Sequence, residues 1–166
     1  MIFEYYSFLL AIINVGDYMY YYINSLYVFS LFGFVLESTI YKIKHSNRYS
    51  SIFYGPVTTV YGFGIISLLL LDKYILNKIH CNKILKIFIT YILCVIVLSI
   101  IELIGGNVLN IIFNIDMWDY SDKAIHFGKY LCLDLCLLWG IFGVLYLYVI
   151  KEYTDRKSTR LNSSHD

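Results

Sequence analysis

The sequence predicts an all-α, polytopic integral membrane protein with about four transmembrane helices in an up-and-down bundle. Apolar residues make up 59% of the 166 residues and aromatic residues 19%, and the mean hydropathy is +0.65. A soluble domain of this size could not cover so much apolar surface with polar side chains. Four apolar runs have the roughly 20 residues that cross a bilayer as a helix, and none alternates as the strands of a membrane barrel do.

The two ends of the chain differ from the central membrane domain, which we place at residues 23–154. Residues 1–22 contain a short apolar stretch with neither a positive start nor a good cleavage site, so we predict an interfacial segment or an upstream extension. Residues 155–166 resemble a translated sequencing adapter, and we exclude them from fold prediction. On this interpretation the membrane domain is truncated at its C-terminus.

The predicted spans are residues 23–41, 52–71, 84–104 and 130–150. Tyrosines at positions 18 and 20–22 form an aromatic belt where the first span enters the bilayer. Basic residues near the spans divide five to each face, so the positive-inside rule predicts no orientation. The richness in Ile, Asn, Lys and Tyr fits a bacterial source, and we expect the bacterial plasma membrane.

Three of the apolar runs carry one acid each, and these acids are the candidate substrate or ion pathway. Up-and-down threading places Glu37, Glu102 and Asp134 toward the same membrane face. An ionisable residue inside a span indicates function by default. Glu102 follows a long apolar run and precedes Gly105-Gly106, where we expect the helix to loosen or approach another backbone.

The other two acids have alternative explanations. Glu37 either faces the bundle or snorkels toward Lys42 or Lys44. Asp134 has no opposite charge beside it in the apolar run, although Lys129 is a possible structural partner.

Two aromatic and glycine-containing motifs mark the predicted membrane interface. Gly55 and Pro56 precede Tyr61 at the mouth of the second span, which indicates a helix start or a kink that lines a polar cavity. Trp118, Asp119 and Tyr120 lie in the loop before the fourth span, where Trp118 and Tyr120 would anchor the loop among lipid headgroups.

Metal binding and cysteine chemistry are weaker alternatives. Asp119, Asp122 and His126 could ligate a metal, because residues 122 and 126 would share a helix face. The four cysteines, Cys81, Cys94, Cys132 and Cys136, include no Cys-x-x-Cys pair, and we interpret them as packing residues.

Several function classes are excluded by what the sequence lacks. The net charge is only +1 and no dense basic block occurs, so we predict no nucleic-acid partner. No P-loop, nucleophile elbow or zinc helix occurs, which favours a role other than catalysis and predicts no cofactor. Any ATPase would be a separate subunit; the other expected partners are membrane lipids and a second copy in a homo-oligomer.

Six short motifs together resemble a bacterial family. They are Gly33-Phe-Val-Leu-Glu37, Tyr54-Gly-Pro56, Tyr61-Gly-Phe-Gly64, Glu102 with Gly106, Trp118-Asp-Tyr-Ser121, and Leu131-Cys-Leu133 with Trp139-Gly140. Over roughly Leu26 to Ile150, the chain is similar to the type IV ABC-transporter permease family, CmpB-like. The resemblance implies a transport-related membrane subunit and leaves the substrate open.

Three functions remain open at this point. The first is a permease or transport-related subunit whose acids bind a cation, a proton or a basic solute. The second is a small intramembrane enzyme that acts on lipid or isoprenoid headgroups through Asp119, Asp122 and His126. The third is a non-catalytic assembly or regulatory subunit, in which the acids only pair helices.

Overall fold

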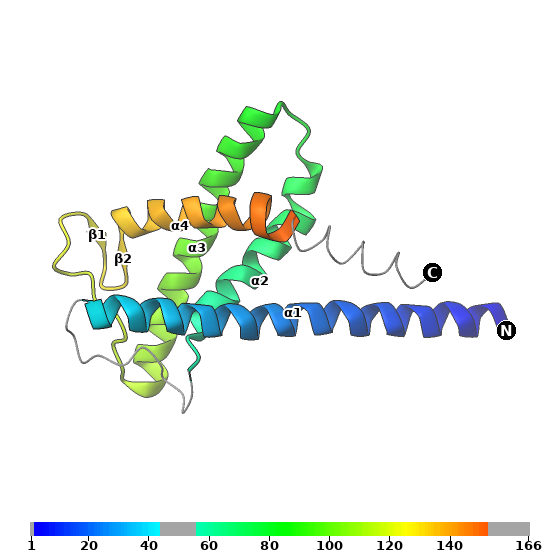
Figure 1. Cartoon of the computed structure of the whole chain (residues 1–166), viewed down its shortest axis with the longest axis horizontal. Coiled ribbons are helices and arrows are strands. Elements are labelled where there is room, and N and C mark those ends of the chain that lie inside the picture. Colours follow the sequence, from blue (N-terminus) through cyan, green and yellow to red (C-terminus); the bar gives the residue numbers. More distant parts are fainter. Residues whose placement is uncertain (1, 44–55, 153–166) are drawn as a thin grey trace. The chain divides into compact units, whose positions relative to one another are not determined.

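The computed structural model confirms the predicted all-α class (Figure 1). It describes residues 2–43 and 56–152. Within these ranges, four helices are long and apolar enough to cross a membrane. Their membrane-crossing segments are Met19–Ile40, Thr59–Lys78, Lys83–Phe113 and Leu133–Ile150.

The helices are longer at some ends than the apolar runs suggest. Helix α1 is continuous over Ile2–Ile43, so the segment predicted as interfacial is helical from Ile2 onward. Helix α2 covers Thr59–Tyr74 and is followed by a short 3-10 turn, η1 (Leu76–Lys78). Pro56 precedes α2 by three residues, so it neither opens nor kinks that helix. Gly55 and residues 155–166 lie outside the described residues.

Helix α3 covers Lys83–Phe113. We expected it either to loosen or to approach another backbone at Gly105-Gly106, and it passes through both glycines without a break. Glycine costs about 1 kcal/mol against alanine in a soluble helix, but membrane helices tolerate it well. The helix ends at Asn114, whose left-handed backbone (φ 54°) lets its N–H bond the carbonyls of Leu109 and Asn110. At the other end, the Asn82 side chain accepts a hydrogen bond from the N–H of Leu85, as an N-cap does.

The described chain falls into two compact parts, one up to residue 66 and one from residue 67 onward. In the first part, α1 packs on the beginning of α2 through Gly62. A Cβ atom at Gly62 would lie 2.5 Å from the backbone oxygen of Leu26 and 2.4 Å from Oγ of Ser30. The N–H of Thr58 also donates a 3.0 Å hydrogen bond to the carbonyl of Ser30. The two helices are therefore in backbone-level contact, as small-residue packing in membranes requires.

The second part is built on α3 and α4 (Leu133–Leu145), with α4 continuing as the π-helical turn η2 (Tyr146–Ile150). The two helices run in opposite directions, because Thr90 meets Tyr148 near one end and Glu102 meets Trp139 further along. Between these pairs Gly140 lies against α3, where a Cβ would be 2.4 Å from Val95. The small residues of the fourth span thus serve close helix packing.

A small antiparallel hairpin precedes α4 and was not predicted. Strand β1 (His126–Phe127) pairs with β2 (Leu131–Cys132), in the register His126 to Cys132 and Phe127 to Leu131. Gly128 makes the turn with φ 65°, a conformation that favours glycine. Because β2 is followed directly by Leu133, the hairpin lies at the beginning of α4 (Figure 1).

Three of the four cysteines are buried, as expected of packing residues. Cys94, Cys132 and Cys136 are buried, and Cys81 is exposed. Cys94 fills the space beside Gly143 of α4, where an added Cβ would lie 2.8 Å from the Cys94 Cβ. This thiol therefore contributes to the α3/α4 interface as a small apolar group.

Candidate functional site

The carboxylate of Glu102 is buried between α3, α4 and the loop that joins them. Glu102 is only 7% exposed to solvent. Tyr120 donates a 3.0 Å hydrogen bond from its hydroxyl to Oε1, and Trp139 donates a 3.2 Å hydrogen bond from Nε1 to Oε2. Each carboxylate oxygen therefore has a neutral donor, one from the loop and one from α4.

Local packing explains how the loop reaches Glu102. Gly106, one turn further along α3, is buried against the ring of Tyr130, and a Cβ there would lie 2.5 Å from Cγ of that ring. A glycine thus lets the end of the hairpin lie directly on α3. The N–H of Tyr120 donates a 2.8 Å hydrogen bond to the carbonyl of Lys129, which joins the first part of the loop to the hairpin.

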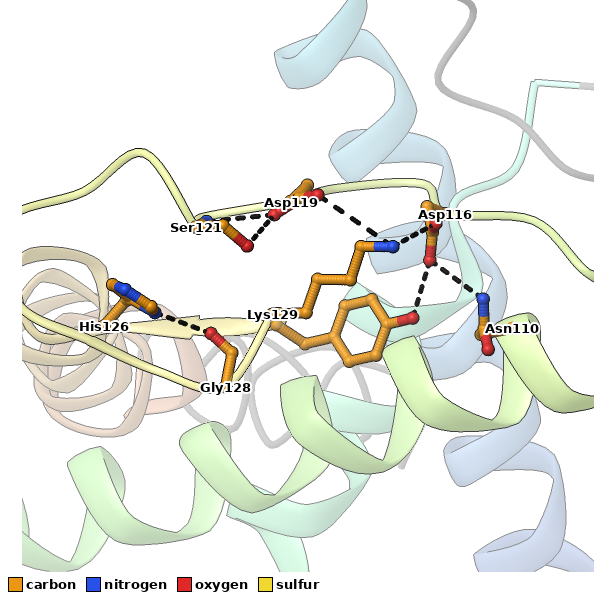
Figure 2. A network of polar contacts seen from close by, with 8 residues as sticks. Asn110, Asp116, Asp119, Ser121, His126, Gly128 and Lys129 are labelled. Atoms are coloured by element: carbon orange, nitrogen blue, oxygen red, sulfur yellow. Dashed lines mark hydrogen bonds and ion pairs between the residues drawn. The ribbon is translucent and has the colours of Figure 1, made fainter.

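Asp116 is the centre of a second polar cluster, at the loop end of α3 (Figure 2). Its Oδ1 accepts hydrogen bonds from Asn110 at 3.0 Å and from the Tyr130 hydroxyl at 2.6 Å, and its Oδ2 binds the ammonium of Lys129. The cluster joins the last turn of α3 to the hairpin, so it fixes the loop that carries Tyr120.

The charges in this cluster shift one another's protonation. The hydrogen bonds from Lys129 and Tyr130 hold the pKa of the Asp116 carboxyl below its usual value. The carboxylate of Asp116 in turn raises the pKa values of Lys129 and Tyr130. All three effects favour the ion pair, which at this exposed position is screened by solvent.

The predicted interfacial residues of this loop are used within the protein. Trp118 donates a 3.3 Å hydrogen bond from Nε1 to the carbonyl of Tyr130, and its ring meets the Tyr130 ring edge-on. Asp119 accepts hydrogen bonds from the N–H and hydroxyl of Ser121, which lower its pKa, and lies 3.9 Å from the Lys129 ammonium. The polar ends of Trp118 and Tyr120 are thus bonded to protein atoms.

The structure does not bring together the alternative metal ligands. In the part of the chain that it describes, no group of three His, Cys, Asp or Glu side chains is arranged to hold a metal ion. Nδ1 of His126 lies 2.8 Å from the carbonyl of Gly128, within its own hairpin (Figure 2). Asp119 binds Ser121, and Asp122 is exposed to solvent.

Asp134 lies in the first turn of α4 and is exposed. Within residues 2–43 and 56–152, no ion pair joins it to another side chain, and the Lys129 considered as its partner binds Asp116 instead. A carboxylate at this position interacts favourably with the positive end of the helix dipole. A role of Asp134 in the substrate or ion pathway stays a prediction.

Glu37 belongs to the first compact part of the chain, and its contacts lie within that part. It lies near the end of the first membrane-crossing segment, is half-buried, and accepts a hydrogen bond from the side chain of Tyr61 on α2. Tyr61, part of the motif expected at the start of the second span, thus joins α2 to the acid of α1. Convergence of Glu37 with Glu102 stays a prediction.

Sequence patterns missed the Asp116 cluster because its members lie far apart in the chain. Asp116 and Lys129 are 13 residues apart, and only the hairpin brings them together. The one local signal is Gly128, which lies between His126-Phe127 and Lys129-Tyr130 and could have indicated a turn.

These features define a polytopic α-helical membrane protein with a buried, hydrogen-bonded acid in its third span. The chain belongs to the family described as "Putative ABC-transporter type IV", whose family model matches residues 25–165. The resemblance seen in the sequence is therefore confirmed. No curated protein and no solved structure matches the chain.

Proposed function

We propose that this protein is the membrane-embedded permease, or a transport-related subunit, of an ABC-type transporter, and that Glu102 is its acidic site. The family and the four membrane-crossing helices support the class of protein. The site would bind a cation, a proton or a basic group of the transported solute.

The burial of Glu102 is the observation that carries the proposal. An ionisable side chain within a membrane-crossing helix costs several kcal/mol unless it is bonded, so it is rarely present without a use. Glu102 is 7% exposed and lies within the span Lys83–Phe113. An acid that only joined helices could be replaced, together with its donors, by apolar residues of similar shape at little cost, so the buried carboxylate favours a role in binding.

Two hydrogen-bond donors of Glu102 are uncharged. Tyr120 and Trp139 each donate one bond to a different oxygen of the carboxylate, so they orient the carboxylate without neutralising its charge. A bound cation, a proton or a basic group of the solute would supply the positive charge.

The energy source would be a second polypeptide. The sequence contains no Gly-x-x-x-x-Gly-Lys motif, so ATP hydrolysis would require an ATP-binding-cassette subunit. Four spans also offer little surface for a complete pathway, and a homo-oligomer would enlarge it. The protein would act in the bacterial plasma membrane.

The test is to co-express the chain with the products of its neighbouring genes, purify the complex and measure ATP hydrolysis in proteoliposomes. We expect an ATP-binding-cassette protein to co-purify and the complex to hydrolyse ATP faster than the ATPase subunit alone. Glu102→Gln keeps the shape and one acceptor oxygen, which can accept the Trp139 bond while the Tyr120 hydroxyl accepts from the new amide nitrogen. It removes the negative charge, and it should abolish this stimulation. Asp134→Asn is the matched control, because it neutralises an exposed acid nearby in the same pair of helices.

Two results would contradict different parts of the proposal. If no ATP-binding-cassette protein binds the chain, the transporter role is wrong. If the complex forms and Glu102→Gln stimulates ATP hydrolysis fully, the transporter role stands and the acidic site is wrong.

A further inference from the structure

One face of the hairpin before α4 is apolar and exposed. Ile125 is 55% exposed and Phe127 is 60% exposed. Because side chains alternate along a strand, both lie on one side of β1, with His126 on the other. Phe127 is also paired with Leu131, the last residue but one before α4. Two large apolar side chains are therefore turned away from the protein side by side.

The pairing of the hairpin fixes its depth relative to the membrane. Strand β2 continues without a spacer into Leu133, the first residue of the fourth membrane-crossing segment. His126 pairs with Cys132, and the N–H of Leu133 donates a 3.1 Å hydrogen bond to the carbonyl of Ile125. Paired strands lie only about 5 Å apart. Ile125 thus lies level with Leu133, the first residue of the helix segment that is apolar enough to cross a membrane.

The hairpin is also held rigidly in this place. Lys129 binds Asp116 (Figure 2). The carbonyl of Lys129 accepts a hydrogen bond from the N–H of Tyr120, and the Tyr130 ring lies on Gly106. Turning this face of the hairpin inward would break these contacts. A preorganised apolar edge at the membrane surface loses little entropy when it enters the interfacial layer.

The size of the apolar edge argues for lipid and against a second protein. A stable protein contact buries about 800 Å² on each partner. A fully buried aromatic side chain supplies about 150–250 Å², and Ile125 and Phe127 are only 55% and 60% exposed, so together they supply far less than a protein contact needs. Lipid imposes no such minimum, because the interfacial layer already surrounds every membrane-crossing helix. Trp118 and Tyr120, the anchors suggested by the sequence, are half-buried and bonded within the protein.

We infer that Ile125 and Phe127 form a membrane anchor, which inserts the hairpin into the interfacial layer of the bilayer beside the beginning of α4. The anchor sets the depth of the loop that carries Tyr120, independently of what the protein transports. It replaces the Trp and Tyr anchors that are more usual at this level of a membrane.

The test measures the depth of single positions in the full chain. Ile125→Cys and Phe127→Cys are labelled with an environment-sensitive fluorophore in a Cys81→Ser background, since the other three cysteines are buried. Asp122→Cys is the control position, being exposed on the same loop. Each protein is reconstituted in phosphatidylcholine–phosphatidylglycerol vesicles and quenched either by nitroxide-labelled lipid or by iodide in the water.

We expect lipid nitroxide to quench labels at positions 125 and 127 more strongly than the label at 122, and iodide to show the reverse order. Equal iodide quenching at all three positions would overturn the inference. Protection of 125 and 127 from both quenchers would overturn it too, because a protein neighbour would then cover them. If a cysteine variant does not fold, Phe127→Trp and Asp122→Trp in brominated lipid give the same comparison, against the constant signal of the two native tryptophans.

Discussion

Trp139 donates a hydrogen bond to Glu102 from 37 residues away in the sequence, and so connects α4 to the acid of α3. The bond is 3.2 Å long and ends on Oε2, the carboxylate oxygen that Tyr120 does not use. The same contact therefore holds two membrane-crossing helices together and orients the acid proposed to bind the ligand.

Replacing Trp139 by Phe should lower the free energy of unfolding by on the order of 1 kcal/mol, the range for a hydrogen bond in a membrane protein. In a Glu102→Gln background the same replacement should cost less, because the charged acceptor is gone. Both free energies of unfolding are measured by denaturation in detergent, monitored by circular dichroism. Trp118→Phe, which loses a bond to a backbone carbonyl, should cost the same in both backgrounds. If Trp139→Phe lowers the free energy of unfolding equally in the original and the Glu102→Gln background, the coupling between Trp139 and Glu102 is disproved.

Gly106→Ala should destabilise the protein by about 1–3 kcal/mol, the usual cost of overpacking. The new methyl group would meet the Tyr130 ring at 2.5 Å, and the ring is held by its bond to Asp116. The adjacent Gly105→Ala makes the same chemical change at a half-buried position and should be tolerated. The same denaturation assay measures both, and an equal loss in the two variants would contradict the predicted contact.

The Asp116–Lys129 pair predicts how stability responds to pH. The pKa of Asp116 is lowered on folding, so its contribution is present above its unfolded value of about 3.9 and is lost as pH falls through the lower folded value. The pKa of Lys129 is raised, so its contribution is present below about 10.4 and is lost as pH rises through the higher folded value. The contribution of the pair should be constant between these limits.

Asp116→Asn should therefore reduce the loss of stability below about pH 4. The free energy of unfolding, measured between pH 6 and pH 3 at low salt, gives the slope for each variant. Asp122→Asn is the matched control, because Asp122 is exposed on the same loop. If the free energy of unfolding falls between pH 6 and pH 3 with the same slope in Asp116→Asn as in the unmodified protein, other carboxyl groups cause the loss of stability.

Tyr61→Phe should weaken the contact between α1 and α2 by on the order of 1 kcal/mol. The replacement removes the hydroxyl group that bonds Glu37 and leaves the ring in place. Tyr27→Phe removes a hydroxyl from an α1 tyrosine that is 64% exposed, and it should have little effect. A loss in Tyr61→Phe that persists in full when Glu37 is also replaced by Gln would rule out the bond as its cause.

The length of the apolar runs was sufficient to predict the four spans, because the thickness of the hydrocarbon core sets how many consecutive apolar residues a crossing helix needs. Glu102 was found for a related reason, since a single carboxylate stands out in an apolar run. At Gly105-Gly106 we expected the helix either to loosen or to approach another backbone; the helix stays continuous, and the ring of Tyr130 lies against Gly106.

The loop could not be predicted in the same way. Strands β1 and β2 have two residues each, too few for an alternating pattern to be detected. Lys129 has Asp116, Asp119, Asp122 and Asp134 as possible partners along the chain, and sequence distance does not distinguish them. The choice of Asp116 depends on the hairpin register, which is a property of the folded chain.

The length of α3 makes the protein sensitive to the thickness of its membrane. Its 31 residues extend for about 46 Å at 1.5 Å per residue, whereas a typical hydrocarbon core is about 30 Å thick. Polar residues such as Lys83 and Asn110 lie near the two ends of the helix, so part of this length can extend beyond the hydrocarbon. Tilting the helix or thickening the surrounding lipid accommodates any remaining mismatch. The depth of Glu102 is therefore set jointly by the protein and by the acyl-chain length of the lipids around it, and changing that length would move the acid without any mutation.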